Sequence, residues 1–116
     1  MNPRILIIDD EPLIALDFEV SLREEGFEVV GIARDESSAL EYIDNTDLDF
    51  VVLDADLNGV SGERVAERLR EVDLPYAVVT GYSARQLDWL NGATLIQKPA
   101  DHKKLISEIR LKTNNR

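Results

Sequence analysis

Short apolar runs alternate with amphipathic segments from one end of the chain to the other. The runs fall at residues 5–8 (ILII), 29–32 (VVGI), 50–53 (FVVL), 76–79 (YAVV) and 94–96 (TLI). Between them, apolar residues recur at intervals of three and four, the spacing of a helix that buries one face. The first and third runs are continuous and rich in branched residues, which is typical of parallel strands buried on both faces. The pattern predicts strands that alternate with helices.

Residues that favour helix ends support this interpretation. Pro12 lies just inside the first predicted helix, and Gly26 lies where that helix should stop. The later helices are each preceded by a residue that caps helix N-termini, namely Asp35, Ser61, Ser83 and Asp101. Five strand–helix units therefore fill the 116 residues.

This alternation implies right-handed crossovers and a parallel sheet with helices on both faces. A closed eight-unit barrel needs roughly 250 residues, so the sheet must be open. We expect an α/β fold of the flavodoxin-like (βα)5 type, with a five-stranded sheet of order 2-1-3-4-5. We expect residues 1–116 to form a single domain with no output domain, ending in a polar tail at 113–116.

Composition excludes several kinds of site. The chain has no cysteine and one histidine, which excludes a disulfide scaffold, a cysteine nucleophile and an imidazole metal cluster. No apolar run approaches the roughly 20 residues that span a bilayer, and we expect a cytoplasmic protein. The net charge of −10 repels nucleic acid and anionic membranes, so neither is an expected partner.

Residues with useful chemistry follow the predicted strands, where the crevice of an open α/β sheet lies. Asp9 and Asp10 follow the first strand, Asp54 ends the third, Thr80 ends the fourth and Lys98 follows the fifth. Each alone has an ordinary explanation, such as a helix cap, a turn hydroxyl or a surface ammonium. It is improbable that all these polar and charged residues follow the predicted strands by coincidence.

Three converging carboxylates repel one another, and a divalent cation with oxygen ligands relieves that repulsion. Mg²⁺ suits the site because it keeps water ligands and then accepts a phosphoryl oxygen. A carboxylate with a free oxygen can become a nucleophile that forms an aspartyl phosphate. Lys98 and Thr80 could then contact the phosphoryl oxygens.

Four segments resemble the receiver domain of two-component response regulators, and the resemblance covers nearly the whole chain. They are residues 5–12 (ILIIDDEP), 50–62 (FVVLDADLNGVSG), 78–81 (VVTG) and 97–99 (QKP). The resemblance implies that Asp54 is phosphorylated and that Asp9, Asp10, Asp54 and the backbone carbonyl of Asp56 hold Mg²⁺.

By the same resemblance, Thr80 is the switch hydroxyl, Lys98 is the phosphate-binding lysine and the Lys98–Pro99 bond is cis. The implied partner is a sensor histidine kinase. The chain would catalyse only its own phosphorylation and dephosphorylation, and would act through protein contact or as a phosphate shuttle or sink.

Two positions differ from the common receiver pattern. Gly81 replaces the usual alanine after the switch threonine, and Leu95 replaces an aromatic residue three positions before the lysine. Both differences resemble a subgroup of single-domain receivers that is common in alphaproteobacteria. That subgroup has a Phe-Ala-Thr-Gly-Tyr-like stretch, and in this chain Val78 and Val79 stand in place of its Phe-Ala. We expect Gly81 and Tyr82 to transmit movement of Thr80, and Tyr82 to border the open side of the site.

This interpretation places the downstream partner on the face of the fourth helix, the fifth strand and the fifth helix, with a partly exposed Trp89 nearby. The chain would be a monomer or a phosphorylation-dependent dimer. His102, in the first turn of the last helix, is expected to be an exposed polar residue without a phosphoryl role.

Two other functions remain as alternatives. A phosphatase of the haloacid dehalogenase type shares the Asp54-Ala55-Asp56 pattern, although its Asp-x-Asp follows the first strand and it needs a larger chain. A nucleotide binder of the same topology would need a glycine-rich loop after the first strand, where this chain has acids.

Overall fold

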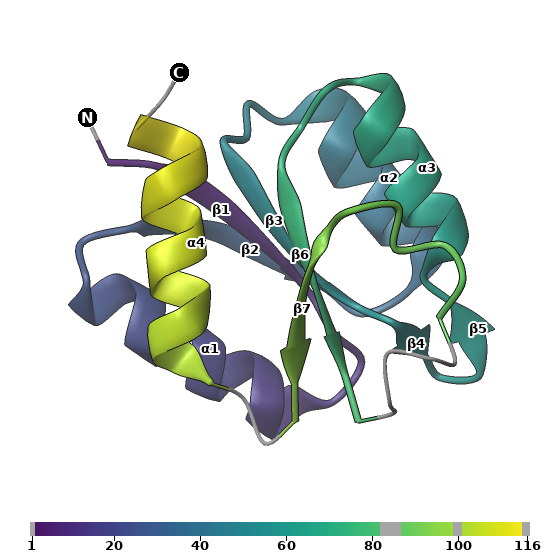
Figure 1. Ribbon diagram of the computed structural model, residues 1–116, viewed down its shortest axis with the longest axis horizontal. Coiled ribbons are helices and arrows are strands. Elements are labelled where there is room, and N and C mark those ends of the chain that lie inside the picture. Colours follow the sequence, from purple (N-terminus) through teal and green to yellow (C-terminus); the bar gives the residue numbers. More distant parts are fainter. Residues whose placement is uncertain (1, 82–86, 99–100, 115–116) are drawn as a thin grey trace.

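The computed structural model describes residues 2–81, 87–98 and 101–114. Their centre is a five-stranded parallel sheet of order β2-β1-β3-β6-β7 (Figure 1). The five strands are β1 (Arg4–Ile8), β2 (Glu28–Ala33), β3 (Phe50–Asp54), β6 (Tyr76–Thr80) and β7 (Thr94–Gln97). When only these five strands are numbered, in chain order, their order in the sheet is 2-1-3-4-5. The predicted topology is therefore confirmed.

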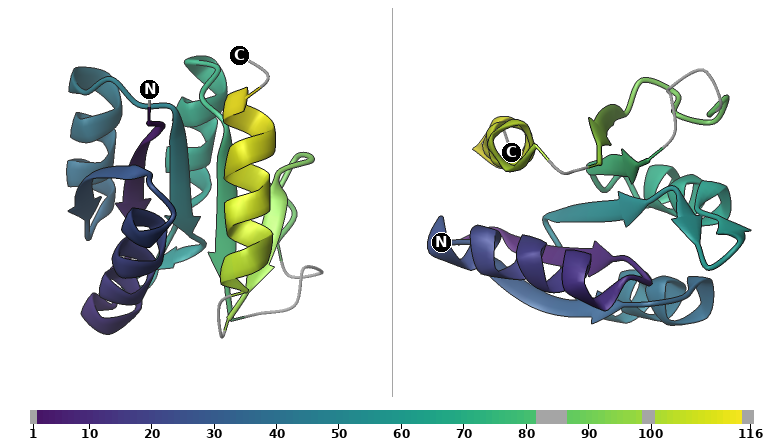
Figure 2. Two further views of the ribbon diagram at one scale, coloured as in Figure 1. Left: turned by 90° about the vertical axis from the view of Figure 1, so that its left-hand side faces the viewer. Right: turned by 90° about the horizontal axis from the view of Figure 1, so that it is seen from below.

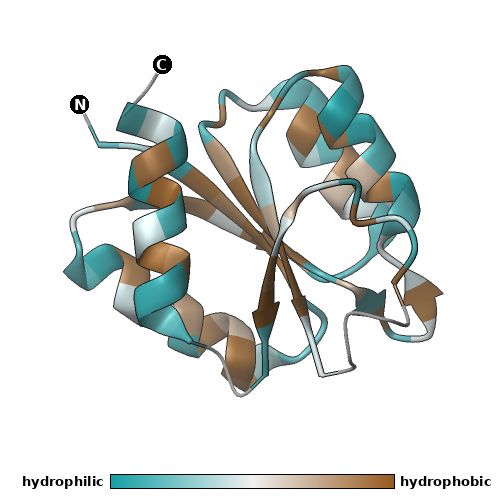
Figure 3. Cartoon of the chain, viewed as in Figure 1, coloured by the Kyte–Doolittle hydropathy of each residue, from teal (hydrophilic) through white to brown (hydrophobic). Residues whose placement is uncertain are grey.

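Helices cover both faces of the sheet, as Figures 1 and 2 show. They are α1 (Pro12–Glu24), α2 (Glu36–Asn45), α3 (Glu63–Glu71) and α4 (His102–Asn114). Ile5 and Ile7 of β1 pack in the same cluster as buried residues of α1 and α4, whereas Leu6 and Ile8 pack with α2 and α3. Successive side chains of a strand point to opposite faces, so strands covered on both faces carry unbroken apolar runs, such as residues 5–8 of β1 and 50–53 of β3 (Figure 3).

Local capping explains where the helices begin and end. Asp35 accepts a hydrogen bond from the Ser38 amide at 2.8 Å, and Asp101 accepts one from the Lys104 amide at 3.0 Å. Gly26, just past α1, has a φ of 89°, a conformation that glycine adopts without strain. These predicted helix boundaries are confirmed.

The predicted fourth helix is the main difference from expectation. Residues 82–86, which include its expected start, lie outside the described residues, and residues 87–92 form turns rather than a helix. Asn91 and Gly92 both have positive φ, 50° and 84°, which ends any helical path at that point. Trp89 is only 8% exposed, so the expectation of a partly exposed side chain is wrong.

A short antiparallel hairpin, β4 (Asp56–Leu57) and β5 (Val60–Ser61), follows β3 directly. Its turn is Asn58-Gly59, with φ values of 55° and 88°, as a two-residue type I′ turn requires. The Asp56 carboxylate accepts a hydrogen bond from the Gly59 amide at 2.9 Å. The hairpin therefore holds the chain that follows Asp54 in a defined position.

Among the described residues, no helix is both long enough and apolar enough to cross a bilayer.

Gly62 packs directly against the end of β3, which generates a prediction about stability. A Cβ added there would lie 2.7 Å from the Asp54 backbone oxygen and 3.4 Å from Leu53 Cδ1. The φ of Gly62 is −74°, which alanine adopts without strain, so the effect of Gly62→Ala is purely steric. We expect this change to lower the free energy of unfolding by about 1–3 kcal/mol, measured by urea denaturation.

Gly81→Ala is the matched control, because its added Cβ meets no atom of the described residues within 4 Å beyond its chain neighbours, and its φ lies outside the left-handed region. Equal denaturation midpoints for the two variants would show that the Gly62 contact relaxes at no cost.

Candidate functional site

The carboxyl ends of the strands meet at one edge of the sheet and surround a hollow of about 370 Å³. Parallel pairing fixes this arrangement, since Ile8 pairs with Leu53, and the Lys98 amide donates a hydrogen bond to the Thr80 carbonyl at 2.8 Å. The hollow is lined by Asp10, Glu11, Asp54, Asp56, Asn58, Gly59, Thr80, Gly81 and Lys98. The sequence predicted this edge and most of these residues.

Four carboxylates gather at the site. Asp9, Asp10, Glu11 and Asp54 each offer an oxygen, and these oxygens all lie within 4.8 Å of one another. Asp9 and Asp54 are 2% and 3% exposed, so water scarcely hydrates either charge. Closely spaced carboxylate oxygens are the ligands that Mg²⁺ and Ca²⁺ prefer, and the donor set fits such a cation.

The electrostatics of Asp54 show how much negative charge the site holds. Burial, followed by the charge of Asp9, raises the pKa of Asp54 to about 7. Hydrogen bonding from the Asp56 amide at 3.2 Å and the charge of Lys98 act in the opposite direction but do not overcome these effects. Without further positive charge, Asp54 therefore retains a proton up to near-neutral pH.

Asp9 behaves in the same way as Asp54. Burial raises its pKa, and the Glu11 amide, which donates a hydrogen bond to Asp9 Oδ1 at 2.9 Å, only partly offsets this. The charge of Asp9 in turn acts on Asp54 and raises its pKa. The two buried acids thus form a coupled pair for which one added cation would favour the ionised form of both.

Lys98 supplies the positive charge that the structure shows at this site. Its Nζ donates to Glu11 Oε1 at 2.6 Å and to Asp54 Oδ2 at 3.3 Å. Burial alone would lower the pKa of Lys98, but the hydrogen bond to Glu11 and the charges of Asp54 and Asp9 outweigh burial and raise it. The ammonium is therefore charged at neutral pH and contacts the predicted phosphoacceptor directly.

Sequence reasoning gave Glu11 no role, although it follows Asp9 and Asp10 without interruption. The run of three acids was a visible signal, but its contact with Lys98 spans 87 positions of the chain. The lining residues Asn58 and Gly59 were also missed, although Asn-Gly is a recognisable hairpin-turn signal.

The remaining predicted positions differ in what the structure shows. Thr80 is 1% exposed and lines the hollow, and Leu95 is half-buried against the α2 and α3 side of the core. Gly81 also lines the hollow, but its φ is not in the left-handed region, so its backbone does not require glycine. Tyr82 and Pro99, with the expected cis bond, lie outside the described residues.

His102 connects two helices, in contrast to the exposed residue that was expected. Its Nδ1 lies 2.5 Å from Ser21 Oγ, its Nε2 lies 3.3 Å from Asp17 Oδ2, and its ring lies 5.3 Å from that of Phe18. All three partners belong to α1, so these contacts help α4 to pack against α1.

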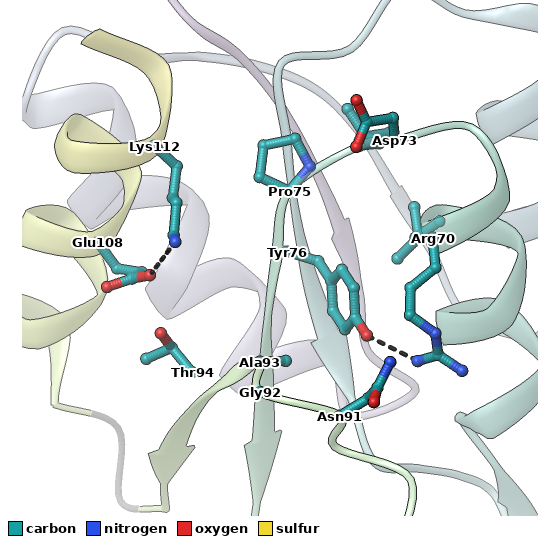
Figure 4. Close-up of a pocket in the computed structure, with 12 residues that line it drawn as sticks. Arg70, Asp73, Pro75, Tyr76, Asn91, Gly92, Ala93, Thr94, Glu108 and Lys112 are labelled. Carbon is teal, nitrogen blue, oxygen red and sulfur yellow. Dashed lines mark hydrogen bonds and ion pairs between the residues drawn. The ribbon is translucent and has the colours of Figure 1, made fainter. Parts of the chain in front are cut away.

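A separate hollow of about 530 Å³ lies at the opposite ends of β6 and β7 (Figure 4). There Arg70 donates to the Tyr76 hydroxyl at 2.9 Å, and Lys112 pairs with Glu108 at 3.8 Å. These contacts occupy both cations with neighbouring side chains, and the residues that line the hollow form no group comparable with the acidic site.

Comparisons with known proteins agree with the geometry of the site. The model of the response regulator receiver domain matches residues 5–110. The transcriptional regulatory protein PdtaR of Mycobacterium tuberculosis is 36% identical over 85 residues, which cover 72% of this chain and 42% of PdtaR. The phyllosphere-induced regulator PhyR of Methylorubrum extorquens is 35% identical over 105 residues, covering 85% of this chain and 39% of PhyR.

Among solved structures, the crystal structure of PhyR from Brucella abortus superimposes with a TM-score of 0.84 and 32% identity. The superposition covers 99% of this chain and 49% of that one. The chain spans about half the length of these relatives or less. The matched relatives are response regulators and give no support to the phosphatase alternative. The chain belongs to the response regulator receiver domain family.

Proposed function

We propose that this chain accepts a phosphoryl group from the phosphohistidine of a sensor kinase onto Asp54, with Mg²⁺ bound beside it. A receiver domain has a histidine kinase as its general partner, so the donor class follows from the family. One observation carries the assignment to Asp54. Its carboxylate is buried at the end of β3, beside Asp9 and within 3.3 Å of the Lys98 ammonium.

In the transfer step, an oxygen of Asp54 forms a bond to phosphorus while the bond from phosphorus to the histidine nitrogen breaks. The electron pair of the broken bond stays on that nitrogen. Lys98 offsets negative charge on the phosphoryl oxygens, and the Thr80 hydroxyl at the end of β6 offers them a further hydrogen bond.

Asp9, Asp10, Asp54 and the backbone carbonyl of Asp56 would hold the Mg²⁺. The support is the cluster of hard oxygen donors and the raised pKa of both buried acids, which marks a deficit of positive charge. When bound, Mg²⁺ supplies positive charge next to the phosphoryl oxygens. We propose no turnover of other substrates, because the phosphoryl group is transferred to Asp54, a residue of the chain itself.

Asp10 and Glu11, which directly precede α1, line the hollow, and we propose that a kinase approaches Asp54 beside this helix. This helix exposes a row of apolar side chains, with Leu13, Leu16 and Val20 exposed by 82%, 51% and 47%. We propose that the kinase contacts this row during transfer, in the cytoplasm, where such a kinase presents its phosphohistidine.

For the downstream partner, or for a second copy of the phosphorylated chain, we propose the face made by residues 87–93, β7 and α4. Thr80 and Lys98 support this proposal, because Thr80 ends β6, which pairs with β7, and Lys98 directly follows β7. Contact with a downstream partner would make the chain an effector. Transfer of the phosphoryl group to another protein would make it a shuttle, and hydrolysis of that group would make it a sink.

Phosphorylation is tested first. Incubation with acetyl phosphate and Mg²⁺ should add the mass of one phosphoryl group, detected by intact-protein mass spectrometry. Asp54→Asn should abolish this addition, because an amide oxygen is a poor nucleophile. Asp73→Asn makes the same chemical change at the opposite edge of the sheet and should behave like the unaltered protein. An adduct that persists in Asp54→Asn would place the acceptor elsewhere.

The affinity for Mg²⁺ should depend on pH in a defined direction. Burial and the Asp9 charge raise the pKa of Asp54 to about 7, so below that pH a proton competes with the metal. We expect the affinity to fall by up to about tenfold for each pH unit below 7 and to level off above it, measured by calorimetry. Asp54→Asn should bind more weakly and with a flatter pH profile. An affinity independent of pH in the unaltered protein would contradict the raised pKa.

The role of Thr80 can be separated from phosphorylation. Thr80→Ala removes the hydroxyl at the end of β6 but leaves the acids and Lys98 in place. We expect the variant to accept one phosphoryl group yet show a smaller difference between its free and phosphorylated NMR spectra. A spectral difference as large as that of the unaltered protein would remove Thr80 from the response.

A further inference from the structure

Glu11 begins α1 in an unusual way. N-cap residues are usually short polar side chains that accept a hydrogen bond from an amide of the first turn. Glu11 is the N-cap of α1, but its side chain makes no such bond. Its backbone carbonyl accepts the first hydrogen bond of the helix, from the Ala15 amide at 3.0 Å. The residue starts the helix while its carboxylate is directed elsewhere.

That carboxylate contacts Lys98, which directly follows β7 and lies 87 positions along the chain from Glu11. Lys98 Nζ lies 2.6 Å from Glu11 Oε1 and 3.3 Å from Asp54 Oδ2. The Glu11 side chain is 54% exposed and the Asp54 side chain is 4% exposed. The ammonium is therefore shared between two acids and lies closer to the hydrated one at the mouth of the site.

A phosphoryl group on Asp54 changes this balance. It adds up to two negative charges and three acceptor oxygens on the buried side of Lys98. Water screens the attraction between buried charges less than that between exposed ones, so the phosphoryl group competes strongly with Glu11 for the ammonium. The same group repels the Glu11 carboxylate. Both effects lengthen the contact between Lys98 and Glu11.

We propose that Glu11 is a positioning residue that holds the Lys98 ammonium before phosphorylation and couples its departure to the start of α1. When Lys98 turns to the phosphoryl group, Glu11 loses the contact that ties it to the end of β7. The first hydrogen bond of α1 uses the Glu11 carbonyl as its acceptor, so this bond opens more often. This inference rests on the proposed phosphorylation of Asp54.

Amide hydrogen exchange at Ala15 tests the proposal. In the unaltered protein, phosphorylation by acetyl phosphate and Mg²⁺ should lower the protection of the Ala15 amide by about fivefold. Glu11→Gln keeps the shape of the side chain but removes its charge, so Lys98 is held weakly. In this variant we expect low protection before phosphorylation and a change of less than about twofold after it.

Glu24→Gln is the matched control, because it removes the same charge from an exposed residue at the other end of α1. It should respond like the unaltered protein. The proposal is overturned if Ala15 in Glu11→Gln starts with full protection and responds in full. It is also overturned if Ala15 in the unaltered protein does not respond although mass spectrometry shows phosphorylated Asp54. Absence of the phosphoryl mass in the unaltered protein would instead refute the proposed function, so the two failures are distinguishable.

Discussion

Negative charge buried at the carboxyl ends of β1 and β3 sets the character of this site. The two strands are adjacent and parallel, so Asp9 and Asp54 must come to the same edge, where apolar layers on both faces exclude water. Oxygens of these two carboxylates lie within 4.8 Å of each other. Two negative charges at about that distance repel by roughly 3 kcal/mol at an effective dielectric constant of about 20. Burial raises the pKa of both acids, and the charge of Asp9 raises that of Asp54 further. Positive charge at this edge therefore favours the ionised form of both acids, which the chemistry requires.

The structure meets part of that requirement from the edge of the sheet. Lys98 follows β7, which is separated from β3 by β6, and its long side chain crosses the end of β6 to reach Asp54. The backbone bond from Lys98 to the Thr80 carbonyl fixes the point from which the side chain starts. Because the same ammonium contacts Glu11, one side chain connects the first and last strands of the chain. A change in the charge of Asp54 thus acts on both ends of the fold through Lys98.

The sequence predicted what local patterns and parallel topology determine, and missed what depends on distant side chains. Apolar runs and caps such as Asp35 and Asp101 located the strands and most helices, and strand order then brought Asp9, Asp54 and Lys98 together. The spacing of apolar residues between the fourth and fifth apolar runs suggested a helix, but the turn at 91–92 competes with it over a short segment. Which of several acids binds Lys98 depends on strand register and side-chain length across 87 positions, so no local pattern could assign Glu11.

The two sides of the hollow differ in how they can respond to a phosphoryl group. On one side, the hairpin after Asp54 is held by its Asn58-Gly59 turn and by the bond from Gly59 to Asp56, and Gly62 packs against the Asp54 backbone. Movement there would break several local contacts at once. On the other side, Lys98 and Glu11 meet through long side chains at the mouth of the site, where a new charge can separate them at little cost in packing. A response to phosphorylation should therefore leave through the ends of β6 and β7 and the start of α1, while the hairpin stays in place.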